Sequence, residues 1–145
     1  MTNWRSELID QALTARQHSY APYSGVMVGA ALLCASGAVF GGANIENASY
    51  PAGICAERTA FAQALFAEER EFIAVAVVGG LAHIPPADYF YPCGICRQWM
   101  AEFCQGDFII MAAKGINDFQ EQTLAVLLPA SFGPMQMNDK KTLFP

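Results

Sequence analysis

Apolar and polar positions recur along the chain with two different periods, and these periods predict its secondary structure. In residues 3–18 apolar side chains return every three or four positions, which is typical of an amphipathic helix. Residues 72–79 are almost continuously apolar and rich in β-branched side chains, which indicates a central strand covered on both faces. The predicted elements are helix 3–18, strands 26–34 and 38–43, a polar loop over 44–51, helix 55–69, strand 72–79, helix 94–104, strand 108–113, a turn at Lys114-Gly115 and a short helix 124–128.

The order of these elements predicts an α/β fold in a single domain spanning residues 1–145. Strands and helices alternate around one apolar sheet, so helices are expected on both faces, as in a three-layer α/β/α sandwich. A chain of 145 residues is long enough to bury a full core. In such sheets ligands bind beyond the carboxyl ends of the strands, where the following helices begin.

Composition and net charge limit the kinds of molecule that the chain is expected to bind. Hydrophobic residues make up 54% of the chain and charged residues only 14%, which suggests that other subunits cover part of the surface. The net charge of −5 and the lack of a basic stripe argue against a nucleic-acid partner. The uncharged run from His18 to Ile45 is interrupted by proline and glycines, so no membrane span is expected. The odd count of five cysteines suits the reducing cytoplasm better than a disulfide framework.

Three of the cysteines have the spacing of metal ligands. Cys93 and Cys96 are three positions apart at the start of a predicted helix, so their sulfur atoms point to one side. Cys55 opens the other central helix and approaches from a second element. Three protein ligands leave the fourth tetrahedral position open, which is the mark of a catalytic zinc.

The neighbours of Cys55 suit such a centre. Three thiolates outweigh the charge of Zn²⁺, and Arg58 together with two helix N-termini can offset the excess. Glu57 is not needed as a ligand and can move protons. Three Cys or His ligands beside a free Glu is the known arrangement of zinc deaminases.

Simpler interpretations exist for each part. Taken alone, Cys93 and Cys96 could form a redox pair or half of a structural zinc site. Cys104 is no candidate for a fourth ligand, because it lies about 12 Å from Cys96 along the same predicted helix. Cys104 and Cys34 are therefore expected in the core.

The chain resembles cytidine deaminases of the small, homotetrameric, zinc-dependent type from about residue 20 to residue 134. The motifs that carry the resemblance are Tyr23-Ser24, Val28-Gly29-Ala30, Asn44-Ile45-Glu46-Asn47-Ala48, Cys55-Ala56-Glu57-Arg58-Thr59, Pro92-Cys93-Gly94-Ile95-Cys96-Arg97-Gln98 and Leu127-Leu128-Pro129. The family fold that it implies is a five-stranded mixed sheet with helices on both faces. The reaction that it implies is deamination of cytidine and 2′-deoxycytidine.

The resemblance also implies a role for each site residue. One zinc per chain would be held by Cys55, Cys93 and Cys96, with Glu57 as the proton shuttle. By the same resemblance, Asn44 and Glu46 would bind the ribose hydroxyls, and the Ala56 backbone would help to hold the base. Phe132 of a neighbouring subunit would stack on the pyrimidine. The implied partners are a nucleoside and further copies of this chain in a homotetramer with shared sites.

Two departures and three alternatives accompany this interpretation. Val26 stands where family members often carry Phe, which makes one apolar wall of the nucleoside pocket smaller. Tyr91 stands where a small residue such as Ser usually precedes Pro-Cys, at the end of a long aromatic loop over residues 81–91. A deaminase of a cytosine nucleoside antibiotic, resembling blasticidin-S deaminase, would share the zinc site. A polynucleotide deaminase would need basic clefts, and a non-enzymatic zinc module would need a fourth protein ligand.

Overall fold

The computed structural model describes residues 3–137; the ends of the predicted domain, residues 1–2 and 138–145, lie outside these bounds. The elements in chain order are α1 (Trp4–Arg16), β1 (Val26–Cys34), β2 (Val39–Ala43), η1 (Tyr50–Ala52), α2 (Ala56–Phe66), β3 (Phe72–Leu81), α3 (Gly94–Phe103), β4 (Ile109–Gly115), β5 (Asp118–Thr123), α4 (Leu124–Leu127) and η2 (Pro134–Gln136). Within the described residues, no helix has the length and apolar character needed to cross a membrane.

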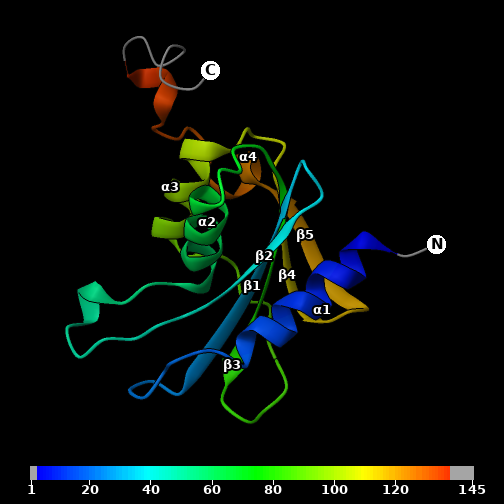
Figure 1. The fold of residues 1–145 in the computed structure, drawn as a ribbon, viewed down its shortest axis with the longest axis vertical. Coiled ribbons are helices and arrows are strands. Elements are labelled where there is room, and N and C mark those ends of the chain that lie inside the picture. The colour runs from blue at the N-terminus through cyan, green and yellow to red at the C-terminus, as the bar shows by residue number, and fades with distance from the viewer. Residues whose placement is uncertain (1–2, 138–145) are drawn as a thin grey trace.

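The strands form one five-stranded mixed sheet in the order β2-β1-β3-β4-β5. β1 pairs antiparallel with both β2 and β3, β3 runs parallel to β4, and β4 pairs antiparallel with β5. Helix α1 covers one face of the sheet, and α2 and α3 cover the other (Figure 1). The predicted α/β/α sandwich is confirmed.

The alternation of side chains along the strands builds a core on each face. Ala30 and Leu32 of β1 and Val77 of β3 point toward α2 and α3, where Phe61 and Met100 complete the larger cluster. The intervening residues face α1, and the members of that second cluster include Ala31, Ala74, Ala76, Val78 and Met111. β3 is therefore buried on both sides, as its continuous apolar run predicted.

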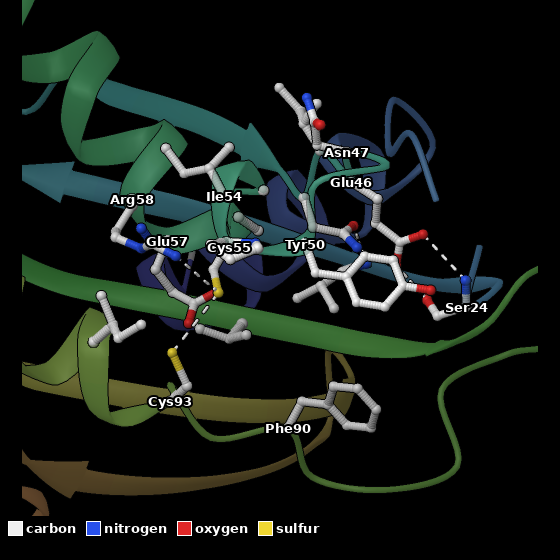
Figure 2. A pocket seen from close by; sticks show the side chains of 18 of the residues that line it. Ser24, Glu46, Asn47, Tyr50, Ile54, Cys55, Glu57, Arg58, Phe90 and Cys93 are labelled. Atoms are coloured by element: carbon white, nitrogen blue, oxygen red, sulfur yellow. Dashed lines mark hydrogen bonds between the residues drawn. The ribbon is translucent and has the colours of Figure 1, made fainter. Parts of the chain in front are cut away.

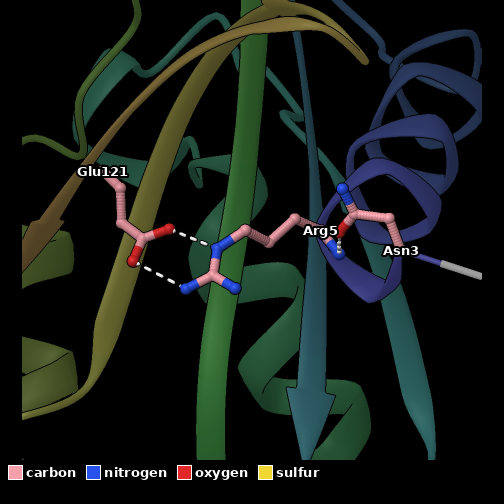
Figure 3. A network of polar contacts seen from close by, with 3 residues as sticks. All are labelled: Asn3, Arg5 and Glu121. Carbon is pink, nitrogen blue, oxygen red and sulfur yellow. Dashed lines mark hydrogen bonds and ion pairs between the residues drawn. The ribbon is translucent and has the colours of Figure 1, made fainter.

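The hydrophobic pattern did not predict β5, and it placed the preceding turn wrongly. β4 continues through Gly115, so the turn lies at residues 116–117 and not at Lys114-Gly115. β5 is an edge strand whose residues are mostly exposed, so no buried face marks it in the sequence. A bidentate ion pair helps to fix this edge: Arg5 of α1 binds Glu121 of β5 through Nε–Oε2 and Nη2–Oε1 contacts of 2.6 and 2.9 Å (Figure 3).

Helix α2 lies directly on the backbone of β2 because Gly42 has no side chain. A Cβ atom at Gly42 would lie 2.3 Å from the Ala56 carbonyl oxygen and 2.5 Å from the Ala60 nitrogen. The first turn of α2 is therefore set against the sheet by backbone contact. This contact fixes the height of the helix start above the sheet.

Candidate metal centre and substrate pocket

Two helix starts bring the three predicted cysteines together. Cys55 is the N-cap residue of α2, Cys93 is the N-cap residue of α3, and Cys96 lies in the first turn of α3. Their sulfur atoms all lie within 4.8 Å of one another, with Cys93 Sγ 3.7 Å from Cys55 Sγ and 3.6 Å from Cys96 Sγ. The N-terminal ends of both helices face this cluster, where their dipoles favour negative charge.

The charge around the sulfur atoms is arranged to favour a thiolate at Cys55. A hydrogen bond from the Cys96 thiol, opposed by burial and supported by Arg58, lowers the pKa of Cys55 to about 5. The same hydrogen bond and burial raise the pKa of Cys96. Arg58 Nη2 lies 3.5 Å from Cys55 Sγ, so the guanidinium contacts one of the three sulfur atoms.

This donor set fits a zinc ion. Three convergent sulfur atoms are the soft ligands that zinc prefers, and a coordinated thiol loses its proton outright. Cys34 and Cys104 are not part of the cluster and pack into the core of the α2–α3 face, as predicted. Within residues 3–137 the cluster therefore offers three cysteine ligands and one open position.

Glu57 is the buried carboxylate of the site. Its side chain is 4% exposed, and burial raises the pKa of the carboxyl group. It projects from the first turn of α2, so that its carboxylate lies beside the sulfur atoms of Cys55 and Cys93 (Figure 2). Burial therefore makes this carboxyl group hold a proton more readily than an exposed one, which suits a group that carries protons.

The cluster opens into a cavity of about 630 Å³. Cys55, Cys93 and Glu57 line one end of the cavity, and Ser24 and Glu46 line the other (Figure 2). The polar loop between β2 and α2 forms much of the wall, so the residues predicted to bind sugar are connected to the cysteine cluster. Ala56, also predicted to contact substrate, is buried and lines the cavity.

Asn44 and Glu46 line the cavity but also hold its wall together. The Asn44 amide donates from Nδ2 to the Val26 carbonyl and accepts at Oδ1 from the Val28 amide, both at 2.8 Å. The Glu46 carboxylate accepts hydrogen bonds from the backbone amides of Tyr23 and Ser24 and from the Ser24 hydroxyl, which lowers the pKa of Glu46. Both side chains therefore order the loops at the end of the cavity that Ser24 and Glu46 line.

Two predicted substrate contacts are not among the residues that line this cavity. Val26 contributes its backbone to the Asn44 contacts, while Val28, two residues along β1, faces the cavity. Phe132 is 62% exposed and shortly precedes η2, a segment that Figure 1 shows at the far end of the molecule from η1. Its carbonyl accepts a hydrogen bond from Gln98 Nε2 at 2.8 Å.

Three aromatic side chains were missed by the sequence-based assignment of the cavity. Tyr23 and Tyr50 both line it, with their rings in an edge-to-face contact at 6.0 Å. Phe90 lines it from the long loop before Cys93. The sequence contained signals for all three: Tyr23 belongs to the Tyr23-Ser24 motif, Tyr50 lies in the polar loop before Cys55, and the loop of Phe90 is rich in aromatic residues. Arg97, which could have reached the metal, instead donates to the carbonyls of Pro92 and Leu127.

Comparison with known proteins gives one consistent family. Residues 2–112 match the sequence family described as the cytidine and deoxycytidylate deaminase zinc-binding region. A cytidine deaminase from Halalkalibacterium halodurans is 46% identical over 135 residues, covering 93% of this chain and 98% of the relative. One from Sporosarcina psychrophila is 44% identical over 126 residues, covering 87% and 89%. The crystal structure of a cytidine deaminase from Burkholderia pseudomallei superposes with a TM-score of 0.80 at 42% identity, covering 91% of this chain and 100% of that one.

Proposed function

Because this chain belongs to the cytidine and deoxycytidylate deaminase family, we propose that it hydrolyses cytidine and 2′-deoxycytidine to uridine and 2′-deoxyuridine, releasing ammonia. One observation carries the proposal: Cys55 and Cys93 of the three-cysteine cluster, the buried Glu57, and Asn44 and Glu46 of the polar loop all line a single cavity. That cavity joins a metal centre to hydrogen-bonding groups suited to a sugar. The chain acts as one catalytic domain, and its reduced cysteines suit the cytoplasm.

Cys55, Cys93 and Cys96 hold one zinc ion per chain in this proposal. Zinc in such a site lowers the pKa of a water molecule to about 7 and so supplies a nucleophile at neutral pH. Arg58 offsets part of the negative charge of the sulfur atoms through its contact with Cys55. The N-termini of α2 and α3 offset more of it.

Glu57 moves the protons of the reaction. It takes a proton from the water that attacks C4 of the cytosine ring and delivers this proton to N3. It then transfers the second proton of that water to the amino group, the C4–N4 bond breaks, and ammonia leaves. Burial favours the neutral form of Glu57, which helps it to hold a proton between these two transfers.

The charges of the cavity favour a nucleoside over a nucleotide. Its lining contains the carboxylate of Glu46, whereas the only cationic side chain among the lining residues within 3–137 is Arg58, which is already bonded to Cys55. A 5′-phosphate would gain no cationic partner there. Free cytosine has no sugar to contact Asn44 and Glu46, so it lacks the binding energy of those contacts and is expected to bind poorly.

A substrate panel tests this function. Cytidine and 2′-deoxycytidine are expected to lose absorbance on deamination, whereas cytosine and 2′-deoxycytidylate are expected to react at least about 100-fold less efficiently. Chelation of the metal should abolish the activity and added zinc should restore it. Preferential turnover of blasticidin S would instead indicate an antibiotic deaminase, and preferential turnover of 2′-deoxycytidylate would contradict the charge argument.

The proposed assembly is a homotetramer in which Phe132 enters the cavity of a neighbouring copy. Its exposed ring, which is not among the residues that line the cavity of its own chain, supports this arrangement. Large apolar side chains elsewhere on the surface would also be covered by other copies; examples are Tyr50, Phe66, Ile95 and Met135. Closed symmetric assembly buries such patches in every subunit equally.

Mixing two impaired variants tests the shared site. Phe132→Ala alone is expected to lower cytidine efficiency about 5- to 150-fold, because stacking of a base on an aromatic ring is worth roughly 1–3 kcal/mol. Co-refolding it with Glu57→Gln should give activity above the average of the two parents, because about a quarter of sites in random mixtures would contain both residues intact. Mixed oligomers that never exceed this average would show that each chain builds its own site.

A further inference from the structure

The aromatic ring of Phe90, which lines the cavity, lies directly on the sheet. Gly79 of β3 pairs with Val28 of β1, and a Cβ atom at Gly79 would lie 2.3 Å from Phe90 Cδ2 and 2.8 Å from Cγ and Cε2. Only glycine, whose side chain is a hydrogen atom, therefore leaves room for the Phe90 ring at position 79. The position of the Phe90 ring thus depends on Gly79.

The residues on either side of Phe90 hold the loop against β5. The Tyr91 hydroxyl lies 2.6 Å from Gln120 Oε1, and the Tyr89 hydroxyl donates to Asp118. Lys114 Nζ lies 4.4 Å from the centre of the Tyr89 ring, a cation–π contact. Because its neighbours are both bound to the edge strand, Phe90 is directed the other way, onto Gly79.

The position of the ring indicates what it meets. In Figure 2, Phe90 lies between the cysteine end of the cavity and the end with Ser24 and Glu46. Glu57 must reach N3 and the amino group of the substrate from α2. The opposite edge of the pyrimidine, C5–C6, then faces the side of the cavity from which Phe90 comes.

We propose that Phe90, seated on Gly79, is a specificity-determining residue that contacts the C5–C6 edge of the pyrimidine and limits the size of substituents there. The inference rests on the proposed function, since it assumes a cytosine nucleoside in the cavity. Phe90 takes no part in proton transfer. Its removal therefore affects binding and selectivity more than the chemical step.

Kinetics of the zinc-loaded enzyme test the proposal. Phe90→Ala is expected to raise the KM for cytidine about 5- to 30-fold with kcat changed less than about 3-fold. It should also reduce the preference for cytidine over 5-iodocytidine by about 10-fold or more. The Kd of the product uridine, measured by calorimetry, should rise in parallel with KM. If folding of this variant is impaired, Phe90→Leu gives the same test with a smaller cavity.

Gly79→Ala should have the same phenotype, because its Cβ displaces the ring. In the double variant Gly79→Ala/Phe90→Ala the glycine substitution should add almost nothing, whereas independent effects would add. Gly80→Ala is the matched control: a Cβ there meets no atom closer than 3.5 Å, so wild-type kinetics are expected. Unchanged KM and selectivity in Phe90→Ala, or additive effects in the double variant, would overturn the proposal. A wild-type enzyme that ignores cytidine would instead refute the proposed function.

Discussion

Glu57→Gln is expected to keep the fold and the zinc content and to lower cytidine turnover by on the order of 10⁴ or more. A single positioned acid–base group contributes about 10² to 10⁴ in rate, and here one residue makes several transfers. Gln has the same shape, so the buried position of Glu57, 4% exposed, remains filled without a cavity. It cannot accept the proton of the attacking water.

Single-turnover kinetics, zinc analysis and thermal unfolding of the same sample measure this effect. Glu71→Gln is the matched control, because Glu71 is exposed just before β3 and should give wild-type turnover. Normal kcat in a zinc-replete Glu57→Gln enzyme would show that another group transfers the protons.

Cys55→Ser is expected to lose the metal and with it all measurable activity. A serine hydroxyl is a much poorer zinc ligand than a thiolate, and two remaining cysteines leave an incomplete site. Zinc binds the folded state, so it stabilises the wild-type protein by about 4 kcal/mol when its concentration exceeds Kd 1,000-fold. That stabilisation should vanish in the variant.

Elemental analysis and melting curves with and without chelator measure both effects. Cys104→Ser provides the control, because Cys104 ends α3 outside the sulfur cluster. It should lower stability modestly while keeping one zinc per chain. Full zinc retention in Cys55→Ser would remove Cys55 from the ligand set.

The metal centre could be predicted from sequence because its information is local. Cys93 and Cys96 share a helical turn, and Cys55 precedes Glu57 and Arg58 in another, so two short motifs contain most of the geometry. The layers of the fold were predictable for a similar reason: periodicity reports which face of each element is buried. β5 lacks a buried face, and only its pairing with β4 makes it a strand.

The aromatic part of the cavity wall was not assigned from the sequence because it depends on contacts between distant segments. The sequence indicated that Val26 makes one wall of the pocket smaller than a Phe would, but it did not indicate which other residue fills the space nearby. In the structure Phe90 occupies the adjoining part of the sheet, over the pair formed by Gly79 and Val28. The internal hydrogen bonds of Asn44 likewise follow from how β1 and the loop meet, not from the motif itself.

Gly42 limits which substitutions this chain can accept during evolution. Surface positions and many core positions tolerate drift, because neighbouring side chains adjust by small shifts. At Gly42 the neighbour is the backbone of α2, which carries Glu57 in its first turn and Cys55 at its start. A substitution that introduced any side chain at Gly42 would push Cys55 and Glu57 away from the sheet together. Gly42 takes no part in the proposed reaction, yet we expect it to be one of the positions that tolerate substitution least.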